Sequence, residues 1–324
     1  MNMKKRHSGP GTSGRLIGAL VGICALTGGA TGAWAAKSPP TAAESRAALL
    51  KKLSPAEVMA AGDQAARGGD FERAITLYNQ GLEAAPSADL WYRVAWIYAR
   101  LGKKQQAADA YGMTLKYDEK HAMALEELGL LYIENKRRET GAAYLTRAVE
   151  SDPARWRSHN ALGVLADTAG DHAAAVAHYQ AALAVAPDSP MLLNNLGYSH
   201  YLAGNMDESE KLYKRALELE PGNRAARINL GLLHARRGNY ALAVEVMGTA
   251  LDKARAHNDV GYVALQNGDI DEAEKLLREA IRLSPAYYET AHQNLKRVTR
   301  ARGAIETAAG PVAPAPEMAA GDAG

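Results

Sequence analysis

The sequence is poor in cysteine, in aromatic residues and in excess charge of either sign. A single cysteine among 324 residues excludes a disulfide framework within the chain and any metal site built from several thiolates. Aromatic residues make up 6% of the chain, with one phenylalanine, which is lean for a β-sandwich or a large enzyme core. Lys plus Arg total 38 and Asp plus Glu total 36, so the concentrated positive charge that nucleic-acid binding needs is lacking. The remaining composition, rich in Ala and Leu, is that of an ordinary soluble protein.

The first 36 residues have the features of a targeting segment. Four basic residues come first, namely Lys4, Lys5, Arg6 and Arg15. The apolar run 16–26 follows, and Ala33-Trp34-Ala35 places small residues at the two positions that a signal peptidase reads. We therefore expect residues 1–36 to be a secretory signal peptide and the mature chain to be periplasmic. Removal of the four basic residues lowers the net charge from +2 to −2.

Two alternatives to a cleaved leader remain open. Cys24 follows a short apolar run and could carry the lipid of a lipoprotein, although the bulky Ile23 fits that processing site poorly. The stretch 16–36 is also about as long as the roughly 20 residues of a membrane span, although five glycines interrupt it. Without lipidation or an anchor, membrane association is expected only through partners.

Residues 55–287 repeat one unit about seven times. A Leu-Gly pair is followed by an Ala, an aromatic residue, a second Ala and a Pro, and the interval from Gly163 to Gly197 is 34 residues. The interval from Gly231 to Gly261 is 30 residues and the closing Pro is absent there, so one repeat boundary is irregular. The apolar positions fall largely at helical spacing, which predicts that every element is a helix. The pattern resembles that of the tetratricopeptide repeat family.

This resemblance implies an all-α fold, a right-handed superhelical solenoid of about seven helix pairs. Small Gly and Ala positions allow the paired helices to approach closely, Tyr or Leu fills the space between them, and Pro fixes the turn to the next repeat. In segments such as Ala169-Gly170-Asp171, Gly supplies the positive φ that ends one helix and Asp or Asn begins the next. We expect a linker at 37–54, a capping helix at 288–302 and a disordered Ala/Pro/Gly-rich tail at 303–324.

Three segments are also similar to the repeat protein of tight-adherence (Flp) pilus assembly, namely residues 158–164, 192–198 and 227–232. Members of that family are usually lipoproteins at the outer membrane that help a secretin assemble. The resemblance implies a periplasmic scaffold for a pilus or secretion complex. Two other functions remain open: an adaptor in a polysaccharide or peptidoglycan synthesis complex, and an enzyme whose site the motifs do not reveal.

The tetratricopeptide resemblance also implies a concave protein-binding groove lined by the first helix of each repeat. Carboxamides donate and accept hydrogen bonds at once, so a row of them can hold an extended peptide backbone, and tyrosine rings add apolar contact. In the alternative interpretation, the asparagines satisfy neighbouring helix ends and the tyrosines pack inside the solenoid. Glu126, Glu127 and Glu134 are expected to be solvated. The predicted groove residues are Tyr92, Trp96, Arg100, Arg157, Asn160, Asn194, Asn195, Tyr198, Tyr201, Asn229, Arg236, Asn258 and Tyr262.

Signatures of catalysis and of metal binding are missing from the mature sequence. It contains no His-Glu-x-x-His, no nucleophile elbow and no Gly-rich loop before a helix. His200 and His234 take the aromatic place of their repeats and are predicted to pack between helices. His172 and His178 are six residues apart, so they do not share one helical face. We therefore predict no enzymatic activity, no cofactor, no metal and no nucleic-acid partner, and we expect a protein partner.

Overall fold

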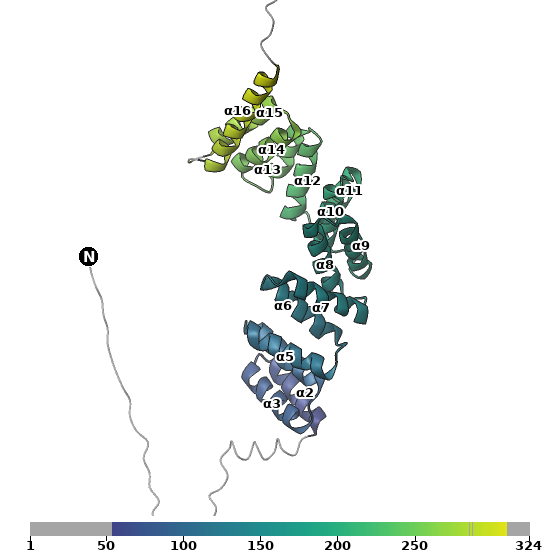
Figure 1. The fold of residues 1–324 in the computed structure, drawn as a ribbon. Coiled ribbons are helices and arrows are strands. Elements are labelled where there is room, and N and C mark those ends of the chain that lie inside the picture. Colours follow the sequence, from purple (N-terminus) through teal and green to yellow (C-terminus); the bar gives the residue numbers. More distant parts are fainter. Residues whose placement is uncertain (1–53, 285, 287, 310–324) are drawn as a thin grey trace, which may run out of the picture. The chain divides into compact units, whose positions relative to one another are not determined.

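The computed structural model describes residues 54–284, 286 and 288–309 (Figure 1). Within this part, the chain forms fifteen α-helices and no strand. The predicted signal peptide, the linker before Ser54 and the tail beyond Ala309 lie outside the described residues. No helix of the described part is both long enough and apolar enough to cross a membrane. The all-α prediction is confirmed.

The first fourteen helices form seven pairs, in which a short turn joins a first helix to a second helix. The first helices are α2 (Pro55–Arg67), α4 (Ala88–Arg100), α6 (Ala122–Glu134), α8 (Trp156–Ala169), α10 (Pro190–Leu202), α12 (Arg224–Arg236) and α14 (Lys253–Asn267). The second helices are α3 (Phe71–Ala84), α5 (Lys104–Tyr117), α7 (Arg138–Ser151), α9 (His172–Val185), α11 (Met206–Leu219), α13 (Tyr240–Gly248) and α15 (Ile270–Leu283). A last helix, α16 (Glu289–Ala309), packs on α14 and α15.

Glycine ends the first helices as the sequence predicts. Gly170, Gly204, Gly238 and Gly268 have φ values of 84°, 81°, 79° and 87°, which residues with a Cβ adopt only with strain. The expected role of the next residue is confirmed only in part. The Asp171 side chain accepts a hydrogen bond from the Ala174 amide at 2.9 Å. The residues that begin the second helices in the other three segments, Asn205, Asn239 and Asp269, make no side-chain cap bond.

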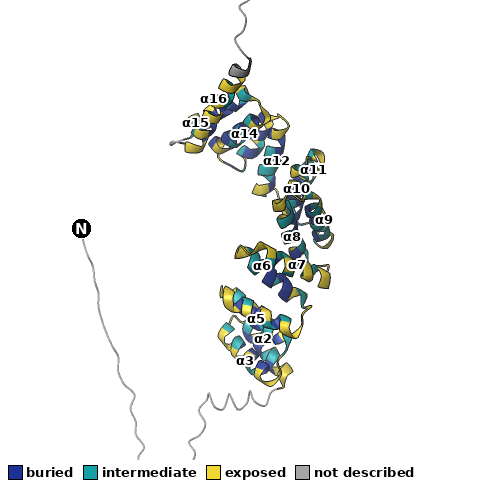
Figure 2. Cartoon of the chain, viewed as in Figure 1, coloured by how far each residue is buried: buried dark blue, intermediate teal, exposed yellow. Residues whose placement is uncertain are grey.

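The core of each repeat lies between its two helices, both of which contribute buried residues (dark blue in Figure 2). A small residue of the first helix meets a large side chain of the second helix. A Cβ added to Gly197 would lie 2.8 Å from Cε1 of Tyr213, and one added to Gly163 would lie 2.7 Å from Cε1 of Tyr179. These distances are too short for real atoms, so glycine is what lets the two helices approach this closely.

The irregular repeat boundary predicted between Gly231 and Gly261 is confirmed as a shortened second helix. Helix α13 has 9 residues, whereas α11 and α15 have 14 each. A turn at 249–251 then leads into α14, whose N-terminus is capped by the side chain of Asp252. A continuous buried cluster spans this region, and it includes Tyr240, Met247, Val260, Leu277 and Val298.

The predicted end of the last helix is wrong. We expected a capping helix at 288–302 and a disordered tail from Gly303, but α16 continues through Gly303 to Ala309. A glycine inside a helix costs only about 1 kcal/mol relative to alanine. The residues that follow, Ala304 to Ala309, include three alanines and a glutamate, which are good helix formers and keep the helix intact beyond the glycine.

Candidate protein-binding face

The predicted groove residues lie on the first helices, and two of them present large exposed aromatic rings. Trp96 of α4 is 38% exposed and Tyr198 of α10 is 42% exposed. Each follows directly after the small residue that packs against the second helix, Ala95 in α4 and Gly197 in α10. The two rings therefore occupy the same position of two different repeats, on the side of the first helix that its partner helix does not cover.

Four of the predicted asparagines bond to one another and form a chain across three repeats. Nδ2 of Asn229 donates to Oδ1 of Asn194 at 2.9 Å, and Nδ2 of Asn195 donates to Oδ1 of Asn160 at 2.9 Å. Nδ2 of Asn194 donates to Oδ1 of Asn195 at 3.3 Å and joins the two bonds. We call these four residues the amide chain. It links α12, α10 and α8, so it ties the first helices of neighbouring repeats together.

The amide chain corrects the expectation that Asn194 opens into a groove. Asn194 is only 9% exposed, and its oxygen and its amide group are both engaged by other asparagines. The alternative, in which the asparagines satisfy neighbouring parts of the solenoid, describes it better, although the partners are side chains and not helix ends. Asn258 behaves similarly, because it accepts from Asn294 of α16 at 3.1 Å and donates to Asp259 at 2.9 Å.

The remaining predicted residues of the C-terminal repeats have partners within the chain. The rings of Tyr198 and Tyr201 stack with their centroids 6.2 Å apart. Nη1 of Arg236 donates to Oδ1 of Asn267 at 3.4 Å. The Tyr262 ring lies under a guanidinium group of α16, at 5.9 Å from Cζ of Arg297. These contacts hold the side chains in place without covering Tyr198.

In the N-terminal repeats, α2, α4 and the start of α6 surround a hollow of about 460 Å³. Tyr92 and Trp96, both predicted groove residues, line it. The predicted Arg100 lies beside it, with Cζ 5.3 Å from the centroid of the Trp96 ring. The structure also brings Asp63 and Arg67 of α2 into the lining. These two residues were not predicted from the sequence. They occupy the same positions in the first repeat that Trp96 and Arg100 occupy in the second, so applying the groove positions to the first repeat would have identified them.

Asp63, one of two acidic residues that line the hollow, is neutralised by its own neighbours. Oδ1 of Asp63 accepts hydrogen bonds from Nε of Arg93 at 2.8 Å and from the hydroxyl of Tyr78 at 2.6 Å. Burial alone would raise the pKa of Asp63, but the bonds from Arg93 and Tyr78 outweigh it and hold the pKa below its ordinary value. Asp63 therefore stays ionised, and its charge is matched by that of Arg93.

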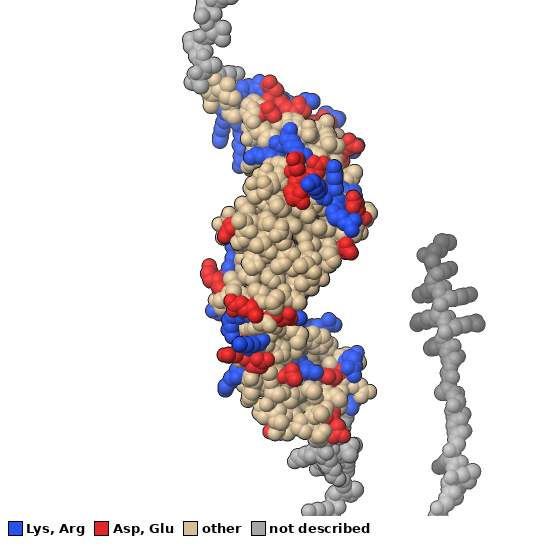
Figure 3. All heavy atoms as spheres, turned by 90° about the vertical axis from the view of Figure 1, so that its right-hand side faces the viewer, with Lys and Arg blue, Asp and Glu red and all other residues tan. Residues whose placement is uncertain are grey.

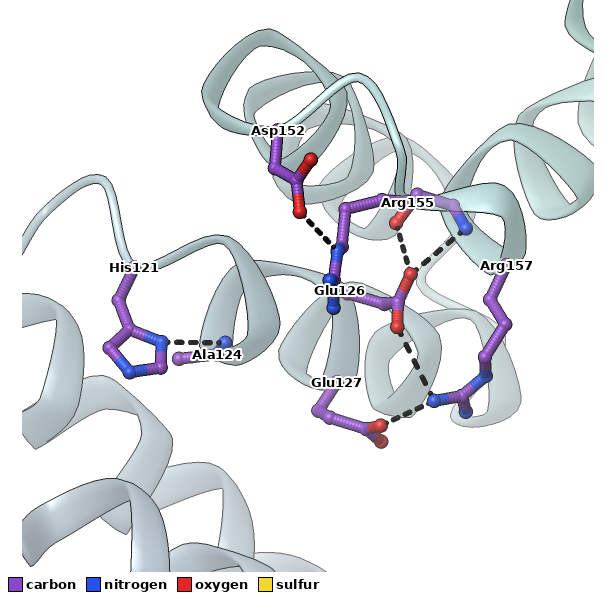
Figure 4. A network of polar contacts seen from close by, with 8 residues as sticks. His121, Ala124, Glu126, Glu127, Asp152, Arg155 and Arg157 are labelled. Carbon is purple, nitrogen blue, oxygen red and sulfur yellow. Dashed lines mark hydrogen bonds and ion pairs between the residues drawn. The ribbon is translucent and has the colours of Figure 1, made fainter. Parts of the chain in front are cut away.

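Next to the hollow, Glu126 forms a buried polar network that the sequence did not predict (Figure 4). Glu126 was expected to be solvated, but it is only 5% exposed. Its Oε2 accepts from the backbone N and the hydroxyl of Ser158 at 3.1 and 2.9 Å, and Nη1 of Arg157 lies 2.5 Å from Oε1 of Glu127. The predicted groove residue Arg157 thus pairs with the carboxylates of α6. Glu134 is exposed as expected and pairs with Lys104.

The histidines pack against other groups. His234 is 7% exposed, which confirms its predicted place between helices, while His200 is half-buried. The Nδ1 atoms of His159 and His178 lie 3.2 Å apart and join α8 to α9. In the described part of the chain, no three His, Cys, Asp or Glu side chains are grouped so that they could hold a metal ion.

Charge is distributed unevenly along the repeats. Helices α9 and α10 contain no Lys, Arg, Asp or Glu, and Figure 3 shows a broad uncharged area between charged clusters. Two members of the amide chain, Asn194 and Asn195, lie on the uncharged α10, whereas charged residues such as Asp63, Arg67 and Arg93 line the hollow. The two parts of the face therefore offer different chemistry to a partner.

Comparison with known proteins identifies the family. The sequence profile described as tetratricopeptide repeat matches residues 59–115, 98–155, 126–190, 160–224 and 194–254, and a second profile of that description matches residues 254–287. The chain belongs to the tetratricopeptide repeat family. Proteins with this fold are typically non-catalytic scaffolds that bind other proteins, and no catalytic family is indicated.

Individual relatives of this tetratricopeptide repeat protein are distant. The BBSome complex member BBS4 of Bos taurus is 26% identical over 191 residues, which cover 58% of the chain and 37% of that relative. The chain thus spans little more than a third of the length of this curated relative. The C-terminal part of a tetratricopeptide repeat-containing protein from Cytophaga hutchinsonii is 18% identical with a TM-score of 0.53, covering 73% of the chain and 99% of that structure.

A tetratricopeptide repeat protein from Parabacteroides merdae is also 18% identical, with a TM-score of 0.51, and the match covers 76% of the chain and 98% of that structure. Similarity at this level shows the solenoid fold alone. None of these findings supports the resemblance to the tight-adherence pilus protein, which stays a prediction.

Proposed function

We propose that the chain is a non-catalytic scaffold that binds an extended segment of a partner protein on the face formed by its first helices. The observation that carries the proposal is the exposure of Trp96 and Tyr198, 38% and 42%, at the same position of two repeats. Large aromatic rings held by a rigid framework lose little entropy on binding and are enriched at protein interfaces. Membership of a family whose proteins generally bind protein partners supports the same function.

We further propose that this scaffold works in the periplasm, in the assembly of a tight-adherence (Flp) type pilus or secretion complex. The basic start of the chain, the apolar run 16–26 and Ala33-Trp34-Ala35 support export. The similarity of residues 158–164, 192–198 and 227–232 to the pilus family supports the assembly role. The partner is then an envelope protein such as a secretin, and contact with the outer membrane comes through the partner or through a lipid on Cys24.

The test is crosslinking in living cells, followed by purification of the full-length chain from the cell envelope. We expect the unaltered chain to recover a pilus or secretion component, and the double variant Trp96→Ala, Tyr198→Ala to recover much less of it. Tyr117→Ala is the matched control, because it removes an exposed ring, 48% exposed, from the second helix α5.

The other outcomes are equally informative. Recovery of a polysaccharide or peptidoglycan synthesis complex would replace the pilus role with that of an adaptor. Equal recovery by the double variant would move binding away from the first helices. Failure to recover any protein, although the chain is exported and folded, would contradict the scaffold function.

A further inference from the structure

The hollow in the N-terminal repeats has an apolar wall that the fold leaves uncovered. Trp96 is 38% exposed and Met123 is 42% exposed, and both line the hollow together with the half-buried Tyr92. Helices α2, α4 and α6 each contribute residues to it. Its volume of about 460 Å³ falls within the usual range of binding pockets, which is room for one large side chain and part of its backbone.

Trp96 is held in a fixed orientation before any partner arrives. The edge of the Phe71 ring packs against it, with the centroids 6.4 Å apart and an interplanar angle of 73°. The guanidinium group of Arg100 lies over the indole, with Cζ 5.3 Å from the ring centroid. Because both neighbours restrict the indole, little conformational entropy remains to be lost when a partner packs against it.

Basic groups outnumber acidic ones around the hollow, because Arg67, Arg93 and Arg100 lie in or beside it together with Asp63 and Asp89. Arg67 is the last residue of α2, and Arg100 is the last residue of α4. The chain reverses direction into α3 and again into α4, so α2 and α4 run in the same direction and their C-terminal ends lie on the same side. No carboxylate of the described residues forms a close ion pair with either arginine. Asp63 pairs with Arg93, and Arg67 acts on it only through the charge. The other carboxylate of the lining, Asp89, lies at the opposite end, at the start of α4, where its charge acts on Arg93.

Neighbouring surfaces do not offer this combination. In the next repeat, Arg157 is already paired with Glu126 and Glu127. Further along, the oxygen of Asn194 and its amide group are engaged within the amide chain. Exposed apolar surface and an excess of positive charge therefore occur side by side at the hollow.

We propose that this hollow anchors an aromatic side chain of a partner protein's extended segment, and that Arg67 and Arg100 bind a carboxylate adjacent or next but one to it. The proposal rests on the protein-binding function proposed above and names its recognition element. The aromatic ring packs against Trp96 and Met123 in place of water. The guanidinium groups form charge-assisted hydrogen bonds with the carboxylate. A lysine at that position of the partner would instead be repelled by the two arginines.

A random octapeptide display library, selected on the purified full chain, tests this directly. We expect the selected peptides to share an aromatic residue with Asp or Glu adjacent or next but one to it. Trp96→Ala and the double variant Arg67→Glu, Arg100→Glu should each weaken a selected peptide by about tenfold or more, as for the central residues of other interfaces. Tyr117→Ala, which removes an exposed ring from the second helix α5, should leave its affinity unchanged.

Three results would overturn the proposal. They are selected peptides without the aromatic and acidic pair, full affinity for the Trp96→Ala chain, and equal binding after the acidic residue of the peptide is replaced by lysine. All of the substituted residues are on the surface, and an unchanged circular dichroism spectrum shows that the variants fold. If an envelope partner is recovered through Tyr198 while the hollow selects no such peptide, the proposed function stands and this inference fails.

Discussion

Six of the seven first helices carry a glycine where they approach their second helix, and the seventh carries Ala95. The large residue on the other side varies: it is Tyr179 opposite Gly163, Leu277 opposite Gly261 and Met247 opposite Gly231. What repeats along the chain is therefore the absence of a large side chain at this position of the first helix. The large residue only has to fill the space that this absence creates.

Replacing Gly197 by Val should destabilise the solenoid by about 1–3 kcal/mol, because the new side chain overlaps the Tyr213 ring in a packed core. A Cβ alone would already lie 2.8 Å from Cε1 of Tyr213. The measurement is the urea midpoint followed by circular dichroism. Gly222→Val is the control, since a Cβ there meets nothing within 4 Å. Equal midpoints for the two variants would show that the helix pair can separate without cost.

The amide chain makes a second prediction about residues. Asn194→Ala leaves Nδ2 of Asn229 without its acceptor at 2.9 Å, and a buried unpaired group costs about 1–3 kcal/mol. In a double-mutant cycle, Asn194→Ala and Asn229→Ala should therefore show a coupling energy of about 0.5–3 kcal/mol. Asn194→Ala and Asn258→Ala share no bond and should add within about 0.5 kcal/mol. Additivity in the first pair would mean that the amide chain is absent in solution.

Helices were easier to predict from the sequence than their contacts. The repeat of Gly, aromatic and Ala positions fixes where each helix pair lies, and the 30-residue interval between Gly231 and Gly261 locates the shortened α13. The end of α16 was predicted too early because Gly303 was read as the end of the helix, whereas the good helix formers after it extend the helix to Ala309. Asn194 was missed because sequence spacing places it on a face but does not show that an asparagine of the next repeat reaches it.

The histidine pair between α8 and α9 should make stability depend on pH. Partial burial lowers the pKa of His159, and burial followed by the charge of His159 lowers the pKa of His178, both from 6.5. Below pH 6.5 the unfolded chain therefore binds more protons than the folded chain. The contribution of the two neutral histidines to the free energy of unfolding is fully present above pH 6.5, and it is lost as the pH falls below 6.5 through their lowered pKa values.

His159→Gln combined with His178→Gln should flatten the fall in unfolding free energy between about pH 7.5 and pH 5. Urea unfolding at several pH values gives the slope. His234, whose pKa burial also lowers, remains in both proteins and does not affect the difference. Asp152 and Glu279 also have lowered pKa values, but their ordinary values are 3.8 and 4.5, so they change the unfolding free energy mainly at lower pH. An unchanged slope would show that folding does not lower the pKa values of these two histidines.

At the scale of the whole molecule, the main contacts between the described helices join each helix pair to its neighbours in sequence. The buried cluster that includes Met247, Leu277 and Val298 belongs to the C-terminal repeats and α16, while the hollow at Trp96 belongs to the N-terminal ones. Stability in such a stack is approximately a sum of repeat and interface contributions, so damage at one end should stay there. Unfolding of the C-terminal repeats should therefore leave the hollow at Trp96 intact.

Val298→Asp tests this insulation, because it buries a charge at a position that is 1% exposed and packs in the C-terminal cluster. Hydrogen exchange followed by mass spectrometry should show lost protection in α14, α15 and α16 and unchanged protection in α4 and α5. Thr299→Asp is the matched control, since it places the same charge at the next, exposed position of α16 and should leave all helices protected. Peptides selected at the hollow should keep their affinity for the Val298→Asp chain. Equal loss of protection in α4 and α15 would mean that the repeats unfold as one unit, in which case the binding face depends on α16 for its order.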